Sequence, residues 1–205
     1  MITDIEKFEI IIEGILANGY GICDDFLTEE EVSKLLILNA NNYNSGLFKA
    51  AGVGKKEDEK QLKLIRGDEI LWLEQDSKNI DQQKLFLKIN ALITYLNQTC
   101  FLGIIGSEFH FSNYEKGRFY KRHRDSFQNK KGRIISVIIY LNNNWEAKDG
   151  GNLMVYPVIE SIETSIDISP IAGRIVCFES EKLEHEVLQT FARRVSITGW
   201  LLNKK

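Results

Sequence analysis

Apolar positions in the first hundred residues follow a helical period, because they recur three and four residues apart. Such stripes run through residues 5–17 and 80–99. A further helix is indicated at Thr28, where the sequence Thr-Glu-Glu-Glu can form a capping box, and we expect it to reach about Asn42. Residues 46–60 contain glycines and a charged run without a period, which is typical of a loop that is either a lid or a solvated linker.

The second half of the chain has a different pattern, with short apolar runs separated by turn residues. Four of these runs are predicted to be strands, at residues 133–141, 151–156, 174–178 and 194–201. A shorter run at Tyr20–Cys23 is also strand-like. Helices followed by many short strands predict an α+β fold whose sheets form a sandwich or a barrel.

Composition narrows the class of protein without defining an activity. The chain has 205 residues, a formal net charge of −3 and a hydrophobic fraction of 43%, so we expect one soluble domain over residues 1–205. The acidic balance disfavours a general nucleic-acid binder, and no nucleic-acid partner is expected. We find no apolar run long enough to span a membrane and no signal-peptide pattern, which predicts a cytoplasmic protein without a membrane partner.

Two of the three histidines lie where a metal site is possible. His123 and Asp125 are two apart in an extended segment, so their side chains can point to one face. His185, beside another strand-like run, is the candidate third ligand. Two histidines and a carboxylate form the facial triad of non-haem Fe(II) proteins, but the same set can hold zinc for hydrolysis, and an isolated His-x-Asp pair is common on surfaces. The remaining histidine, His110, is expected to be structural or exposed.

Several further motifs follow one another in a fixed order around these residues. They are Ile65–Trp72, Tyr114–Phe127, Ile139–Asn142, Trp145, Gly150–Gly151, Pro170–Arg174, His185–Val187, Arg194 and Trp200. Together they resemble the Fe(II)/2-oxoglutarate dioxygenases, and more narrowly the prolyl 4-hydroxylase branch, which includes the animal oxygen-sensing prolyl hydroxylases and their bacterial relatives. The resemblance covers roughly residues 19–202.

This resemblance implies a double-stranded β-helix, a cupin-like jelly-roll barrel, with N-terminal supporting helices. Residues 1–100 would supply mainly helices and a substrate loop, and residues 101–205 would supply the barrel core. His123, Asp125 and His185 would bind Fe(II).

Arg194 would bind the distal carboxylate of 2-oxoglutarate, helped by the hydroxyl of Tyr140. Arg193 competes for this role, and strand alternation alone favours it, because the apolar residues that alternate with Arg194 would face the core of a plain sandwich. The resemblance reverses this expectation, since a barrel that binds a dianionic cosubstrate needs a polar interior face. Trp200, on the same face as Arg194, would help wall the cosubstrate pocket.

Other residues would border the site. Tyr114 and Tyr120 would line it near the cosubstrate and substrate, although both are equally consistent with half-buried barrel aromatics. Arg66, Asp68 and Trp72 would border the substrate entrance. The alternative for the first two is an ion pair that holds a turn.

The implied activity is hydroxylation of a prolyl residue, at carbon 4, in a protein or peptide substrate. The resemblance implies Fe(II) as the metal, 2-oxoglutarate and O2 as cosubstrates, succinate and CO2 as coproducts, and ascorbate as the reductant that keeps the iron ferrous. Two alternatives stay open: the same chemistry on another side chain or a small molecule, and a non-catalytic sensor module that binds 2-oxoglutarate or metal.

Overall fold

The helices of the computed structural model, which describes residues 2–52, 65–126 and 132–204, each begin at a capping side chain. They are α1 (Asp4–Asn18), α2 (Glu29–Asn44) and α4 (Ile80–Thr99). Thr3 and Thr28 form capping boxes, and the amide oxygen of Asn79 accepts from two backbone N–H groups. The three predicted helices are confirmed, and the second extends two residues beyond Asn42. No helix among the described residues is long and apolar enough to cross a membrane.

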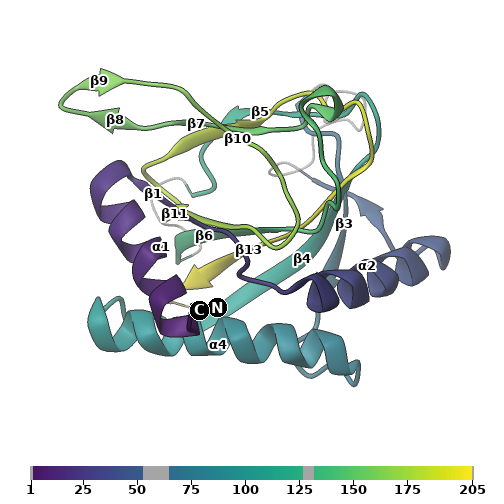
Figure 1. The fold of residues 1–205 in the computed structure, drawn as a ribbon, viewed down its shortest axis with the longest axis horizontal. Coiled ribbons are helices and arrows are strands. Elements are labelled where there is room, and N and C mark those ends of the chain that lie inside the picture. Colours follow the sequence, from purple (N-terminus) through teal and green to yellow (C-terminus); the bar gives the residue numbers. More distant parts are fainter. Residues whose placement is uncertain (1, 53–64, 127–131, 205) are drawn as a thin grey trace.

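The strands form two larger sheets and a small hairpin (Figure 1). They are β1 (Tyr20–Cys23), β2 (Lys49–Ala50), β3 (Glu69–Leu73), β4 (Gly106–Tyr114), β5 (Tyr120–His123), β6 (Arg133–Tyr140), β7 (Leu153–Tyr156), β8 (Val158–Ile159), β9 (Ile162–Glu163), β10 (Ile166–Ile168), β11 (Ile175–Glu179), β12 (Glu184–Val187) and β13 (Arg194–Leu202), with a short 3-10 helix at η1 (Ala147–Asp149). The four predicted strands are confirmed within two residues at each end.

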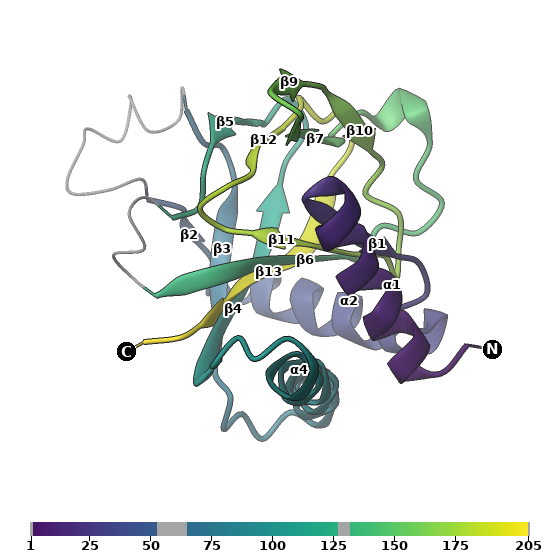
Figure 2. The same cartoon turned by 90° about the vertical axis from the view of Figure 1, so that its left-hand side faces the viewer.

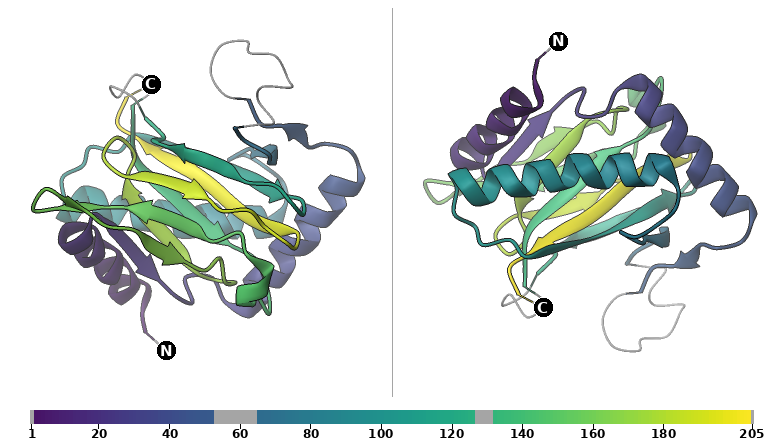
Figure 3. Two further views of the ribbon diagram at one scale, coloured as in Figure 1. Left: turned by 90° about the horizontal axis from the view of Figure 1, so that it is seen from above. Right: turned by 90° about the horizontal axis from the view of Figure 1, so that it is seen from below.

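Two antiparallel sheets face each other. The larger has the order β1-β11-β6-β13-β4-β3-β2, and the smaller has the order β10-β7-β12-β5. Figure 2 shows the small sheet on one side of the large sheet and the helices on the other, and Figure 3 shows α4 crossing the outer face of the large sheet. This is the expected jelly-roll arrangement of an α+β protein, in which one sheet pair encloses an interior and helices support it from outside.

The barrel is not confined to the second half of the chain. Strands β1, β2 and β3 come from the first hundred residues and form both edges of the large sheet. Of these only β1 was predicted as a strand. The loop predicted at residues 46–60 contains β2, and the lid interpretation of that loop falls mainly on residues 53–60, which lie outside the described residues.

Strand β13 lies in the middle of the large sheet between β6 and β4, and cores on both sides of that sheet bury its two faces. Val195, Ile197 and Leu201 belong to the core between this sheet and the helices. Arg194 lies among side chains of the second core, which fills the space between the sheets, and its guanidinium carbon is 5.1 Å from the ring centre of Tyr140. Alternate residues of β13 therefore point into different cores.

Candidate active site

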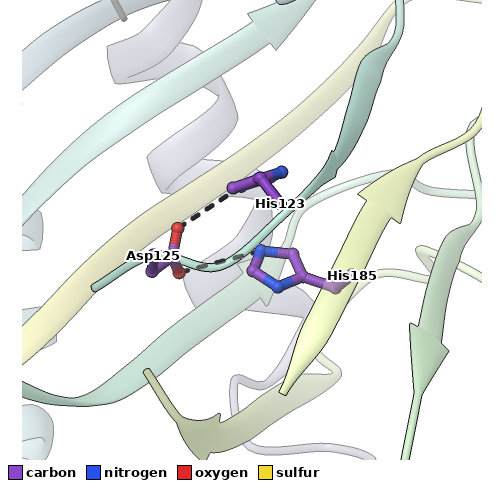
Figure 4. Close-up of side chains that lie close together, drawn as sticks. All are labelled: His123, Asp125 and His185. Atoms are coloured by element: carbon purple, nitrogen blue, oxygen red, sulfur yellow. Dashed lines mark ion pairs between the residues drawn. The ribbon is translucent and has the colours of Figure 1, made fainter. Parts of the chain in front are cut away.

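Two neighbouring strands of the small sheet bring His123, Asp125 and His185 together. His185 on β12 is paired directly with His123 at the end of β5, and Asp125 follows two residues after that end. One ligand atom from each residue lies within 4.8 Å of the others. Figure 4 shows the two imidazoles and the carboxylate pointing toward one another. The two histidines are 62 positions apart in the sequence, and one strand pairing brings them together.

Backbone carbonyls set the orientation of both imidazoles. Nδ1 of His123 lies 2.7 Å from the carbonyl oxygen of Lys121, and Nδ1 of His185 lies 3.3 Å from that of Leu183. A carbonyl can only accept, so each Nδ1 carries the proton. In a neutral imidazole the lone pair is then on Nε2, the atom that lies 3.5 Å from Asp125 for His123 and 3.8 Å for His185.

The protonation states at neutral pH follow from burial and from the neighbouring charges. Burial lowers the pKa of His185 to about 4, although Asp125 acts in the opposite direction, so this imidazole is neutral. Burial acts to raise the pKa of Asp125, but the interactions with His185 and His123 and the hydrogen bond from Ser136 outweigh it and hold that pKa well below its usual range. The carboxylate is therefore ionised.

The three groups fit a cation and do not satisfy one another. The Nε2 atoms of two imidazoles and a carboxylate oxygen converge, and no Lys or Arg in the described ranges forms an ion pair with Asp125. Two imidazole nitrogens and one carboxylate oxygen are the ligand set of non-haem Fe(II) sites that keep positions open for other ligands. These residues could hold such an ion.

Arg194 presents the opposite charge inside the same barrel. Its side chain is 1% exposed, its Nε donates to the carbonyl oxygen of Gly151 at 2.8 Å, and one terminal nitrogen lies 3.4 Å from the hydroxyl of Ser196. Within the described residues it contacts no carboxylate, and the buried hydroxyl of Tyr140 nearby has no hydrogen-bond partner. A buried guanidinium without a counter-ion favours binding of an anion, and its planar donors match a carboxylate.

Arg193 has a different environment from its neighbour. Its side chain is 38% exposed, its Nε lies 3.5 Å from a carboxylate oxygen of Glu115, and its guanidinium lies over the ring of Tyr43 at 4.3 Å. Of the two adjacent arginines, Arg194 is therefore the one whose charge is enclosed by the barrel.

Two tyrosines lie beside these groups. The ring of Tyr120 stacks on His123 with 3.6 Å between ring centres, and the guanidinium of Arg66 lies 4.7 Å from the centre of the Tyr120 ring. Tyr114 is buried, and its ring centre is 5.1 Å from the guanidinium carbon of Arg194. Tyr120 is therefore beside the histidines and Tyr114 beside the arginine.

Arg66 and Asp68 form a closed pair. Arg66 donates to both carboxylate oxygens of Asp68, at 2.5 and 2.9 Å, and the hydroxyl of Ser112 donates to the same carboxylate at 2.7 Å. The segment around Arg66 also bridges to the backbone of Tyr120 on β5. The ion-pair alternative is thus the observed geometry of these two side chains, and the pair links β3 to the strand that carries His123.

Trp72, Trp200 and His110 form an aromatic cluster. Trp72 is 45% exposed, and its ring centre lies 4.9 Å from that of His110 and 6.4 Å from that of Trp200. His110 is buried, which rules out the exposed alternative, and its structural role stays a prediction. The aromatic rings that Trp200 contacts in the described residues are those of Trp72 and His110, and its placement in the cosubstrate wall stays a prediction.

Two serines near the site were missed by the sequence interpretation. The hydroxyl of Ser136 lies 2.7 Å from Asp125, and Ser180 lies 2.9 Å behind Ser136. The only available signal was a polar residue inside the apolar run of β6.

Comparison with known proteins gives the class. Residues 109–202 match the 2OG-Fe(II) oxygenase superfamily. The hypoxia-inducible factor prolyl hydroxylase of Caenorhabditis elegans is 33% identical over 213 residues, which cover 96% of this chain but only 28% of the worm protein. Prolyl hydroxylase EGLN3 of Homo sapiens is 30% identical over 221 residues, which cover 98% of this chain and 86% of the human protein.

Solved structures agree in fold and extent. A prolyl-4-hydroxylase of Pseudomonas putida superimposes with a TM-score of 0.84 at 29% identity, covering 96% of this chain and 99% of the other. A prolyl hydroxylase from Trichoplax adhaerens, solved with a hypoxia-inducible factor peptide fragment, superimposes with a TM-score of 0.87 at 29% identity, covering 98% and 90%.

The fold, the convergent ligand set and these similarities define a 2-oxoglutarate-dependent dioxygenase, an enzyme that uses Fe(II), 2-oxoglutarate and O2. Within the 2OG-Fe(II) oxygenase superfamily, the chain belongs to the prolyl hydroxylase branch. Ascorbate is the reductant typical of this family.

Proposed function

We propose that this protein hydroxylates a prolyl residue, at carbon 4, in a protein or peptide substrate, with succinate and CO2 as coproducts. The observation that carries the proposal is a pair of opposite charges inside one barrel that the described residues leave uncompensated. Asp125, with the Nε2 atoms of two imidazoles beside it, attracts a cation, and Arg194 attracts an anion. A divalent iron and a dicarboxylate cosubstrate would satisfy both.

His123, Asp125 and His185 would hold Fe(II), and the metal would supply the oxidative chemistry when bound. Their contribution would be to present one ligand atom each at the same place inside the barrel. The carbonyl oxygens that accept from Nδ1 keep each Nε2 on the side of Asp125, where the ion would be held.

Arg194 and the hydroxyl of Tyr140 would bind the distal carboxylate of 2-oxoglutarate. Because Nε of Arg194 is held by Gly151, the guanidinium is oriented before the cosubstrate arrives. Tyr114 would lie against the cosubstrate, Trp200 would help wall its pocket, and Tyr120 would line the site beside His123. Burial of Arg194 and Tyr140 excludes water from these contacts, which strengthens them.

The substrate side of the proposal rests on the relatives, among them an enzyme solved with a peptide. Arg66, Asp68 and Trp72 would border the entrance. The exposed face of Trp72 is available for a peptide, whereas Arg66 and Asp68 would act by shaping the entrance, since their charges are already paired.

The experiment combines the purified protein with Fe(II), 2-oxoglutarate, ascorbate, air and a panel of proline-containing peptides. The panel includes a hypoxia-inducible factor degradation-domain peptide. We expect mass spectrometry to show the gain of one oxygen atom on a proline, with one succinate formed per hydroxylation. Reactions under argon, and reactions with His123→Ala or Arg194→Ala, serve as controls and should give no product.

Different outcomes would test the prolyl target, the dioxygenase activity and the ligand residues separately. Oxygen gain on a residue other than proline would contradict the prolyl assignment and leave the dioxygenase intact. Tight binding of metal and 2-oxoglutarate without oxygen transfer to any peptide or amino acid would favour a sensor module. Full activity of either variant would show that the ligand assignment is wrong.

A further inference from the structure

Ser136 is a polar residue in the centre of an apolar strand. It lies on β6 between Ile135 and Val137, and it is fully buried. Its neighbours across the sheet are Phe178 on β11 and Trp200 on β13. A hydroxyl in such a place destabilises the fold unless it is hydrogen-bonded, so its partners indicate its role.

The hydroxyl of Ser136 contacts two oxygens. It lies 2.7 Å from Oδ2 of Asp125 and 2.9 Å from the hydroxyl of Ser180. An ionised carboxylate only accepts, so the single proton of Ser136 goes to Asp125. The hydroxyl of Ser180 must then donate to Ser136. This order gives a directed chain of two hydrogen bonds that ends on the carboxylate.

Backbone hydrogen bonds fix the far end of this chain. The N–H of Ser180 donates to the carbonyl oxygen of Ile134 at 3.0 Å, and its own carbonyl accepts from the N–H of Ser126 at 3.1 Å. Asp125 itself lies beyond the last residue of β5, in a bend without strand pairing. The two serines therefore attach the Asp125 segment to the large sheet, across the barrel interior.

We propose that Ser136, supported by Ser180, is a positioning residue for the Asp125 carboxylate. Its hydrogen bond holds the carboxylate in the rotamer that faces Nε2 of both histidines, so a metal ion meets three ligands already in place. Ser136 does not touch the ion. The inference rests on the proposed function, in which the three residues form the iron site. Partners of this kind typically change metal affinity 10–100-fold when removed.

The test measures Co(II) binding to the metal-free protein by calorimetry and by the visible absorption bands of the bound ion. It compares Ser136→Thr with Ser136→Val, because these side chains have the same shape and differ in the hydroxyl alone. We expect the Thr variant to bind Co(II) within a few-fold of wild type. We expect the Val variant to bind about 10–100-fold more weakly, with shifted absorption bands.

Ser112→Ala is the matched control. It removes an equally buried hydroxyl that donates to the other aspartate, Asp68, at the same 2.7 Å distance. Its Co(II) affinity and spectrum should equal those of wild type. Circular dichroism and thermal unfolding of each metal-free variant verify that the fold is retained.

The results test the role of Ser136 separately from the proposed iron site. Wild-type affinity and an unchanged spectrum in the Val variant would overturn the role of Ser136 and leave the iron site standing. Equal loss in the Thr and Val variants would also overturn it, since the hydroxyl would then make no difference. Absence of Co(II) binding by wild type, or unchanged binding by His123→Ala, would instead contradict the proposed function.

Discussion

Two buried aspartates in this barrel differ in what surrounds them. Asp68 accepts three hydrogen bonds, two from Arg66 and one from Ser112, so its charge is balanced within the chain. Among the described residues, Asp125 accepts a side-chain hydrogen bond from Ser136, and the Nε2 atoms of His123 and His185 lie 3.5 and 3.8 Å from its oxygens.

Two arginines, Arg66 and Arg194, show the same contrast. Arg66 is paired with a carboxylate, whereas Arg194 contacts a backbone carbonyl, a serine hydroxyl and tyrosine rings. Burial alone therefore does not mark a functional charge. A buried charge indicates a ligand when the described surroundings leave it uncompensated.

Breaking the closed pair should have the largest effect on stability. Arg66→Met leaves the Asp68 carboxylate buried without its cation, so we expect the free energy of unfolding to fall by about 3–5 kcal/mol. Urea unfolding followed by circular dichroism measures this loss. Arg174→Met is the control, because it breaks a more exposed pair with Asp24 and should cost less than about 1 kcal/mol. If the free energy of unfolding fell by a similar small amount in both variants, the Arg66–Asp68 pair would not differ from an exposed ion pair.

The same substitution at Arg194, whose charge is not paired with a carboxylate among the described residues, should affect ligand binding instead of stability. Arg194→Met removes an uncompensated charge, so the metal-free protein should be at least as stable as wild type. Its affinity for 2-oxoglutarate should fall about 100-fold, the effect of losing charge-assisted hydrogen bonds. Calorimetric titration of Mn(II)-loaded protein measures the affinity. Arg193→Met, which changes an exposed side chain just before β13, should bind as wild type does, and an equal loss there would contradict the assignment of Arg194.

His110 extends the comparison, because both the paired Asp68 and the metal-site Asp125 influence its pKa. Burial and Arg66 lower the pKa of His110 to about 3, while Asp68 and Asp125 act in the opposite direction. In the unfolded chain His110 takes up a proton near pH 6.5, whereas in the folded protein it stays neutral down to about pH 3. Stability therefore falls as pH drops below 6.5. Between pH 7 and pH 5 this residue should account for about 2 kcal/mol.

His110→Met tests that pH dependence. Urea unfolding of the variant at the two pH values should show a smaller loss than wild type, by about the same 2 kcal/mol. Parallel pH profiles for the two proteins would show that His110 does not remain neutral in the fold.

A smaller effect on binding is expected at Gly151. Its φ is +64°, and a Cβ there would lie 2.9 Å from Thr190 and 3.1 Å from Cδ of Arg194. Gly151→Ala should therefore displace the arginine and weaken 2-oxoglutarate binding about 10-fold, or about 1.4 kcal/mol. Gly103→Ala is matched in backbone conformation, with φ at +63° and no atom within 4 Å. It should lose similar conformational stability and keep wild-type affinity, so weakened binding in both variants would point to general strain instead.

Local patterns sufficed for much of the fold. The capping residues and the apolar stripes of the helices, and the apolar runs of the strands, depend on neighbours in the sequence, so they could be read directly. The inward direction of Arg194 could not be read this way, because alternation distinguishes the faces of a strand only when one face is solvated. On β13 both faces are buried, and only the family resemblance indicated which one is polar.

The closed pair and the serine chain depended on the tertiary structure. Sequence reasoning left open whether Arg66 and Asp68 bind substrate or each other, since both arrangements use the same residues. Ser136 and Ser180 are 44 positions apart, and their contact follows from the pairing of β6 with β11. Nothing in the spacing of two serines predicts that pairing.

The most direct test of the central claim is one isosteric substitution made at both aspartates. The free energy of unfolding is measured by urea titration, without metal and with a chelator, for Asp68→Asn and for Asp125→Asn. We predict a loss of about 3–5 kcal/mol for Asp68→Asn, which leaves Arg66 unpaired. For Asp125→Asn we predict no loss beyond about 1 kcal/mol, because the amide can donate to an imidazole lone pair that the carboxylate only opposes. Equal destabilisation by the two substitutions would contradict the account.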